Sequence, residues 1–216
     1  MVVPFIRNLP NSSRFPKYSY NSLLSTLKIQ SRSSALHEQA IATISKGFDL
    51  AADRLAPELQ HKIFIARNQK FGEFVSQYKG SHKTPDMALK TWDNAGCCKT
   101  MFVLEVGLAE TYNMLLDDTR MWLEGREDVS AVMLMKLQED PEYCCPTRSL
   151  SDQDLTQQNF LGYSQIKHQN FTLEGPYGPA VYNGYTWVGS ISGFIEIWKR
   201  EPVSGSAICA GDRIVS

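Results

Sequence analysis

Two carboxylates in this sequence have the residue types and setting for metal chemistry. Asp86 follows Pro85, and Glu105 lies within the run Thr100 to Val106, which is otherwise almost continuously apolar. A carboxylate inside such a run is costly to bury unless a cation, a hydrogen-bond donor or water meets it. If the two segments are neighbouring strands, both side chains can converge. Two converging carboxylates form a minimal site for Mg²⁺ or Mn²⁺, which can polarise a phosphate and activate water.

The elements that must position these carboxylates can be predicted from hydrophobic spacing. Apolar residues recur every three or four positions from Ser34 to about Leu55 and from about Glu110 to Glu124, which predicts two helices. Strand-like runs cover residues 71–78, 84–90, 100–106 and 129–137, with a hairpin turn at 79–82. The order is helix, two strands, central strand, helix, strand. A right-handed helical crossover would place the last strand parallel to the central one.

The sequence after Pro141 has a different composition, with a polar stretch followed by aromatic and glycine-rich segments. Residues 181–188 and 194–198 are predicted to be strands joined by residues 189–193, as a β extension of the same domain. We therefore predict an α/β fold with a mixed sheet flanked by helices and a C-terminal β extension. The predicted regions are a basic, Ser-rich arm (1–33), a single α/β domain (34–201) and a flexible tail (202–216).

Several of these motifs together resemble the PD-(D/E)XK nuclease clan, and most of all its uncharacterised fungal members and bacterial restriction-endonuclease-like proteins. The resemblance covers roughly residues 34 to 200. It implies a restriction-endonuclease-like fold and a metal-dependent nuclease. The residues that carry it are Pro85-Asp86, Leu104-Glu105-Val106-Gly107, Trp122-Leu123-Glu124-Gly125 at the end of a helix, the strand 129–137 and the closing segment 193–198.

The resemblance also implies roles for single residues. Asp86 and Glu105 would be ligands of Mg²⁺ or Mn²⁺, and Glu38 matches an acidic residue that many members contribute from the first helix. The family's lysine, which orients water and stabilises negative charge, is replaced here by Gly107. Some members supply the basic group from the following helix, which makes Arg120 the first candidate.

Three lysines, Lys79, Lys83 and Lys90, also lie near the proposed site in the sequence. Lys90, at the end of the Pro-Asp strand, is a second candidate for the missing basic group. The pair Lys79 and Lys83 could meet phosphate or could equally belong to a solvated hairpin. An arginine such as Arg120 would stabilise charge but would not act as a general base.

Charge is distributed unevenly along the 216 residues. The chain carries 22 Lys and Arg against 23 Asp and Glu, but the first 37 residues hold five basic residues and no acid. This start fits a mitochondrial transit peptide, an arm that touches phosphate, or a poorly ordered leader. No apolar run approaches the roughly 20 residues of a membrane span, so we expect no membrane role. The expected location is intracellular, with cytoplasm, nucleus and mitochondrion left open.

Three functional hypotheses follow from these observations. The first is a metal-dependent phosphodiesterase acting on DNA or RNA through Asp86 and Glu105. The second is a catalytically inactive nuclease-like fold that serves as a binding module, motivated by Gly107 and by the acidic body of the chain. The third is an unrelated α/β protein in which both carboxylates are ordinary surface groups.

Overall fold

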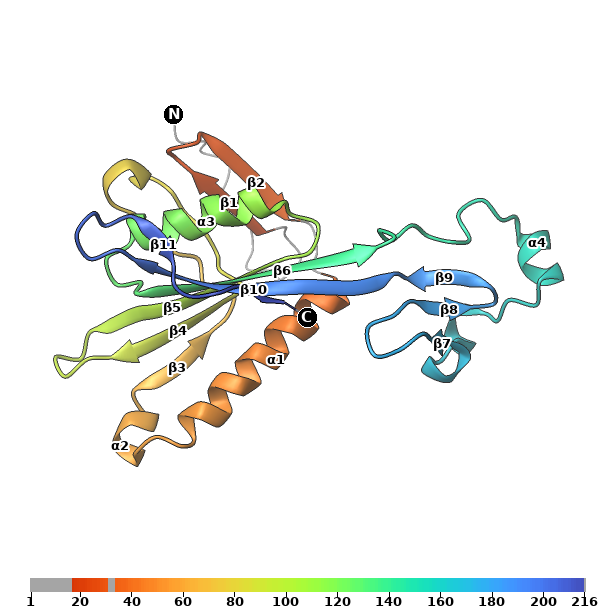
Figure 1. The fold of residues 1–216 in the computed structure, drawn as a ribbon, viewed down its shortest axis with the longest axis horizontal. Coiled ribbons are helices and arrows are strands. Elements are labelled where there is room, and N and C mark those ends of the chain that lie inside the picture. The colour runs from red at the N-terminus through yellow and green to blue at the C-terminus, as the bar shows by residue number, and fades with distance from the viewer. Residues whose placement is uncertain (1–16, 31–33, 216) are drawn as a thin grey trace, which may run out of the picture.

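A mixed β-sheet forms the centre of the computed structural model, which describes residues 17–30 and 34–215 (Figure 1). Its strands run in the order β11-β10-β6-β5-β4-β3, and β12 also pairs with β10. The five longest strands of this sheet are β3 (Ile63–Ala66), β4 (Met87–Trp92), β5 (Cys98–Gly107), β6 (Ala131–Asp140) and β10 (Ser190–Arg200). The predicted α/β class with a mixed sheet, flanking helices and C-terminal strands is confirmed.

The two predicted helices cover opposite faces of this sheet. Helix α1 (Ala35–Ala52) begins at Ser34, whose hydroxyl accepts a hydrogen bond from the His37 backbone N–H. Helix α3 (Tyr112–Gly125) is capped in the same way by Thr111. On the α1 side, Ile41 packs with Leu104 and Val106, whereas on the α3 side the cluster includes Trp122, Val103 and Val132. Successive residues of β5 therefore face α1 and α3 in alternation.

The connection through α3 is the crossover that the sequence predicts. Strand β5 pairs in parallel with β6, with Glu105 opposite Leu134. Strands β3, β4 and β5 form an antiparallel meander, and β10 pairs antiparallel with β6 at ten positions. A short helix, α2 (Pro57–Gln60), follows α1.

Residues 71–78 differ from the predicted strand. Phe71 makes only an isolated bridge to Lys83, and Ser76–Tyr78 form a 3₁₀ turn, η2. The buried side chains here are Phe71, Phe74 and Tyr78, a spacing of three and four that does not match the two-residue period of a strand. The segment instead packs as a loop beneath α3, and β4 takes β3 as its outer neighbour.

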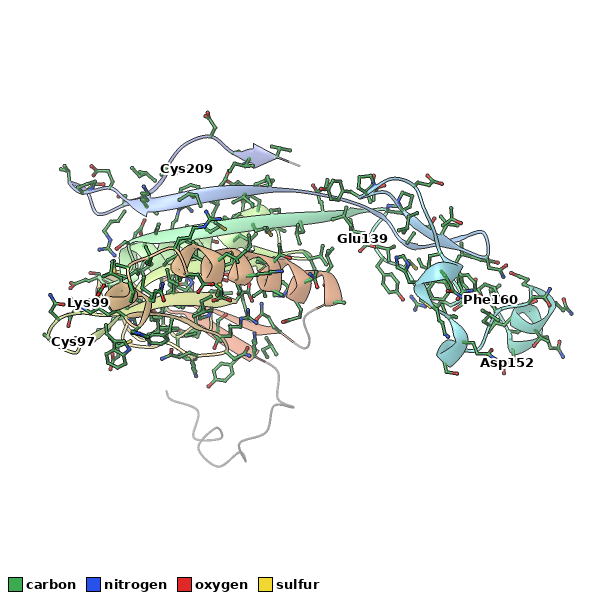
Figure 2. All side chains as sticks on the ribbon, turned by 90° about the horizontal axis from the view of Figure 1, so that it is seen from below. Cys97, Lys99, Glu139, Asp152, Phe160 and Cys209 are labelled. Carbon is green, nitrogen blue, oxygen red and sulfur yellow. The ribbon has the colours of Figure 1, made fainter. Side chains whose placement is uncertain are left out.

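A projecting arm, residues 141–189, separates β6 from β10. It contains α4 (Asp152–Gln157), two 3₁₀ turns (η3, Tyr163–Gln165, and η4, His168–Asn170) and a small sheet of β7 (Thr172–Leu173), β8 (Ala180–Tyr182) and β9 (Tyr185–Val188). Figure 2 shows Asp152 and Phe160 far from Cys97 and Lys99 at the other end of the molecule. The single strand predicted over 181–188 is a hairpin, because Asn183 and Gly184 adopt positive φ. Residues 190–193, predicted as a connection, belong to β10.

Both ends of the described chain contain strands where loose segments were predicted. Strands β11 (Ala207–Cys209) and β12 (Ile214–Val215) pair with β10 inside the expected tail 202–216. Within the expected arm 1–33, β1 (Lys17–Asn21) and β2 (Thr26–Gln30) form an antiparallel hairpin. The other arm residues, 1–16 and 31–33, lie outside the described residues. Among the helices of residues 17–30 and 34–215, none has the length and apolar character of a membrane span.

Gly107 lies where β5 meets α3, and its lack of a side chain is a packing requirement. A Cβ there would stand 2.6 Å from Cδ1 of Leu115, which is fully buried. We expect Gly107→Ala to lower the free energy of unfolding by about 1–3 kcal/mol through overpacking, measured by urea denaturation. Gly47→Ala is the matched control, because nothing lies within 4 Å of the added Cβ on α1. That control should raise stability by about 0.5–1 kcal/mol; equal effects of both variants would contradict the packing argument.

Candidate active site

Glu105 lies on β5, and Asp86 directly precedes the neighbouring strand β4 instead of lying on it as predicted. Met87, the first residue of β4, pairs with Leu104, the residue before Glu105. The backbone N–H of Val106 donates a 2.8 Å hydrogen bond to Oδ2 of Asp86. Both side chains are largely buried, with 8% of Asp86 and 5% of Glu105 exposed. They are therefore not ordinary surface groups, which contradicts the third hypothesis for these residues.

Glu105 is held by a lysine and a tryptophan. Its Oε1 accepts a 2.6 Å hydrogen bond from the indole Nε1–H of Trp122 on α3, and its Oε2 lies 3.2 Å from the Lys83 ammonium. Lys83 belongs to the loop before β4. Its backbone N–H donates to the carbonyl oxygen of Phe71, and its own carbonyl oxygen accepts from the Phe71 N–H. The basic group beside the central carboxylate thus comes from Lys83 rather than from the position of Gly107.

Asp118 completes a buried ion cluster on the α3 side of the sheet. Its Oδ2 lies 2.8 Å from the ammonium nitrogens of both Lys83 and Lys28. Lys28 comes from β2, so the N-terminal hairpin contributes to the cluster. The one basic residue of β2, Lys28, is therefore paired with a carboxylate of the protein.

His37 lies on the other side of Asp86, in the first turn of α1. Its Nε2 is 3.3 Å from Oδ2 of Asp86 and 3.0 Å from the carbonyl oxygen of Val106. Its Nδ1 is buried and, among the described residues, has no hydrogen-bond partner, although Oε1 of Glu38 lies 3.7 Å away. Burial lowers the pKa of His37, but the hydrogen bond and charge of Asp86 outweigh it and raise the pKa.

The charges in this cluster do not balance, since the ammonium groups of Lys83 and Lys28 face the three carboxylates of Asp118, Glu105 and Glu110. Burial opposes ionisation of Asp118, but the two ammonium groups hold its pKa below the ordinary value. Burial raises the pKa of Glu105 to about 8; the negative charges of Asp86 and Asp118 add to this rise and the Lys83 ammonium opposes it. The pKa of Lys83 is raised by the same carboxylates. Glu105 is therefore the carboxylate with too little positive charge around it.

Carboxylate oxygens are the type of ligand that a hard divalent cation takes, although both oxygens of Glu105 and Oδ2 of Asp86 already have partners within the protein. Magnesium is bound in proteins by one or two carboxylates together with waters and substrate phosphates, and the carboxylates of Asp86 and Glu105 supply such ligands. The raised pKa of Glu105 marks a place where additional positive charge would be favourable. Within residues 17–30 and 34–215, no group of three or more His, Cys, Asp or Glu side chains is arranged to hold a metal. The protein's own contribution would thus be the two-carboxylate minimum.

The other predicted site residues are not brought to the two carboxylates. The Glu38 side chain is 61% exposed and its nearest charged neighbour is His37. Arg120 is half-exposed and pairs with Asp117 at 3.4 Å, and Lys90 donates to Gln69 at 3.1 Å. In the described part of the chain, no hydrogen bond or ion pair joins Arg120 or Lys90 to Asp86 or Glu105.

The sequence analysis missed four residues of the site: Lys28, His37, Asp118 and Trp122. Lys83 was noticed only as a hairpin lysine. A signal for Asp118 and Trp122 was available, because both lie four residues apart on one face of the predicted helix and Trp122 lies on its apolar side. Lys28 and His37 carry no comparable signal, since their positions depend on how the hairpin and α1 meet the sheet.

Comparisons of this chain with protein-family models, with curated proteins and with solved structures gave no match. The site is therefore interpreted from its own geometry.

Removing the central ammonium should destabilise the fold. We expect Lys83→Met to lower the free energy of unfolding by about 3 kcal/mol, because it removes the cation beside Glu105 and leaves buried Asp118 with Lys28 alone among the described residues. Urea denaturation at pH 7 measures the loss. Lys79→Met is the matched control, since Lys79 is exposed in the same loop, and should change stability by less than about 0.5 kcal/mol. A Lys83→Met protein as stable as this control would contradict the buried ion cluster.

The raised pKa of Glu105 should make stability fall as the pH rises. The folded state holds the proton up to about pH 8, whereas the ordinary pKa is 4.5, so this stabilisation is complete below 4.5 and is lost as the pH passes 8. We expect Glu105→Gln to flatten the slope of unfolding free energy against pH between 5 and 8, by up to about 1.4 kcal/mol per pH unit. Glu127→Gln, at an exposed residue, should leave the slope unchanged. The same slope in all three proteins would show that Glu105 ionises normally.

Proposed function

We propose that this chain is a divalent-metal-dependent phosphodiesterase that acts on nucleic acid, either DNA or RNA. The observation that carries the proposal is the Lys83 ammonium, 3.2 Å from Oε2 of Glu105, with Asp86 directly before the neighbouring strand β4. Two carboxylates and a lysine are the side chains that the resemblance to PD-(D/E)XK nucleases calls for. Lys83 supports the proposal because it compensates for Gly107, which cannot supply a positive charge.

Each side chain has a part in this proposal. Asp86 and Glu105 would hold Mg²⁺ or Mn²⁺, which when bound polarises the phosphate and lowers the pKa of water. Hydrolysis then adds water across one P–O ester bond and releases a phosphate monoester and a hydroxyl. The Lys83 ammonium would stabilise the negative charge that develops on the phosphate oxygens. Lys28 also binds Oδ2 of Asp118, so Asp118 keeps a cation when Lys83 turns toward phosphate.

A second candidate function is a catalytically inactive binding module, and burial is the observation that favours it. The side chains of Lys83, Asp118 and Glu105 are each at most 5% exposed, and the indole of Trp122 covers one oxygen of Glu105. A phosphate would reach Lys83 only if the hairpin β1–β2 or the loop before β4 moved. In the inactive module these charges would simply tie the hairpin, the loop and α3 to the sheet.

Cleavage assays with matched variants distinguish the two functions. Supercoiled plasmid and single-stranded RNA would be incubated with Mn²⁺ or Mg²⁺ and the wild type, Asp86→Asn, Glu105→Gln or Lys83→Met. Each variant should lower the rate by about 10²–10³. Asp117→Asn on α3 and Lys79→Met are the controls, since both are exposed and of the same residue types, and they should cleave like wild type.

Calorimetric titration with Mn²⁺ completes the test. Binding in the wild type that is lost in Glu105→Gln, together with metal-dependent cleavage, would support the phosphodiesterase. Cleavage that persists in Glu105→Gln would contradict it. A wild type that neither binds Mn²⁺ nor cleaves either substrate would favour the inactive module. Thermal unfolding of each variant separates a lost activity from a lost fold.

A further inference from the structure

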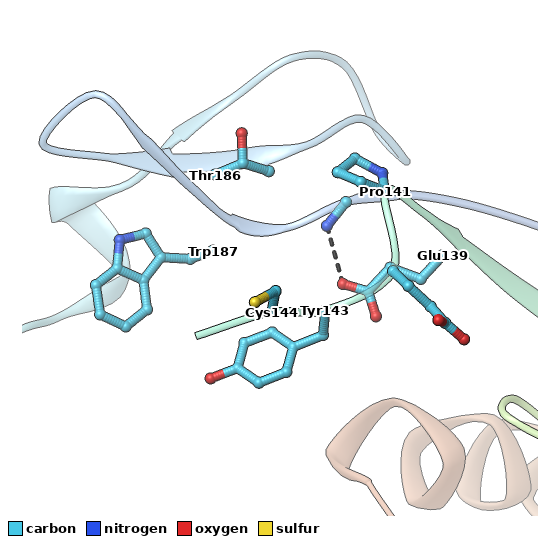
Figure 3. Close-up of a pocket in the computed structure, with 8 residues that line it drawn as sticks. Glu139, Pro141, Tyr143, Cys144, Thr186 and Trp187 are labelled. Atoms are coloured by element: carbon cyan, nitrogen blue, oxygen red, sulfur yellow. Dashed lines mark hydrogen bonds between the residues drawn. The ribbon is translucent and has the colours of Figure 1, made fainter. Parts of the chain in front are cut away.

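We propose that a pocket at the root of the arm binds an alkylammonium group. The root pocket lies where the end of β6 and the segment after it face β9, and it is separate from Asp86 and Glu105 (Figure 3). Its volume is about 160 Å³, below the roughly 300–1,000 Å³ of sites for whole drug-sized molecules, so it suits one head group or side chain. Its lining includes Glu139, Pro141, Glu142, Tyr143, Trp187 and Gly189.

The lining combines aromatic rings with negative charge. Tyr143 and Trp187 contribute the two rings, and Glu139 and Glu142 contribute two carboxylates, with no basic residue in the lining. Aromatic faces attract cations within about 6 Å of the ring centre, more strongly when the site is partly dry, and quaternary ammonium ligands are recognised in this way. The combination therefore favours a cation with apolar substituents over an anion or a neutral polar group.

The pocket walls are held in place before any ligand arrives. The backbone N–H of Gly189 donates a 2.9 Å hydrogen bond to Oε1 of Glu139, which fixes that carboxylate. A Cβ on Gly189 would lie 2.4 Å from the carbonyl oxygen of Pro141, so glycine is required where the segment after β6 passes close to the segment before β10. The indole N–H of Trp187 donates to the carbonyl oxygen of Tyr182, and its ring packs edge-on against Phe171. A rigid site loses little entropy on binding.

The protein does not fill this site with a cation of its own. Among the described residues, neither Glu139 nor Glu142 forms an ion pair. Lys136 is near enough for the charge of Glu142 to act on its pKa, which burial nevertheless lowers. The Lys136 ammonium donates to the carbonyl oxygens of Leu108 and Leu137 instead of to a carboxylate of the pocket. Tyr143 is 61% exposed, which leaves a large aromatic face available at the mouth. These features fit a lysine side chain of a partner, methylated or not, or a free choline-like cation.

The test is a titration of the full chain with tetramethylammonium, followed through the Trp187 indole N–H signal in ¹H–¹⁵N NMR spectra. We expect a saturable shift with a Kd of about 1–10 mM. Tyr143→Ala and Glu142→Gln should weaken binding about tenfold, because they remove a ring face and a carboxylate. Tyr177→Ala and Glu174→Gln are matched controls on the arm outside the pocket, and Kd should change less than about twofold.

A neutral isostere decides whether charge matters. Choline should bind at least about fivefold more tightly than 3,3-dimethylbutanol, which has the same shape without the charge. Equal binding of the two, no saturation by about 50 mM, or equal effects of pocket and control variants would overturn the proposal. Peptides carrying lysine or trimethyllysine identify the source of the cation: tighter binding than choline indicates a protein partner, and weaker binding indicates a small molecule. The readout is independent of the proposed nuclease activity.

Discussion

The ammonium of Lys83, buried between Asp118 and Glu105, is the interaction on which the rest of the structure depends. It joins the loop before β4, helix α3 and the central strand β5 through two contacts of 2.8 and 3.2 Å. Lys28 extends the cluster to the N-terminal hairpin. Because charges this deeply buried are costly without partners, separating any of the four segments from this cluster would destabilise the fold. The cluster thus sets both the geometry of the candidate site and the order of the chain around it.

Close packing between α3 and β5 explains why the positive charge arrives from a loop. Leu115 occupies the space above Gly107, so a lysine on β5 at that position would have to displace a fully buried side chain. Lys83, from the loop before β4, instead brings its ammonium to 3.2 Å from Oε2 of Glu105.

The two long helices were predictable from the sequence because they depend on local periodicity, whereas β3 beside β4 was not predicted. The spacing of apolar residues in α1 and α3 and the parallel pairing of β5 with β6 followed directly. Residues 71–78 were misread because aromatic residues under a helix resemble a strand in composition, though not in period. Lys83, Lys28 and His37 were not identified as site residues because their places depend on tertiary contacts between segments up to about ninety positions apart. Strands β11 and β12 were missed for another reason, since they are too short to show any period.

The ladder between β6 and β10 has a consequence for how this chain can vary. Its ten pairs end at Asp140 and Ser190, so the 49 residues between them leave the sheet and return at adjoining positions. The arm is thus a long insertion between the two strands of one hairpin. The β6–β10 ladder holds the two ends of the arm together, and the entropic cost of closing such a loop grows only slowly with its length. Lengthening of the arm away from the close contact of Gly189 with Pro141 would therefore cost little and leave the register of the sheet intact. Diversification could act on the arm while Asp86, Glu105 and Lys83 stay fixed.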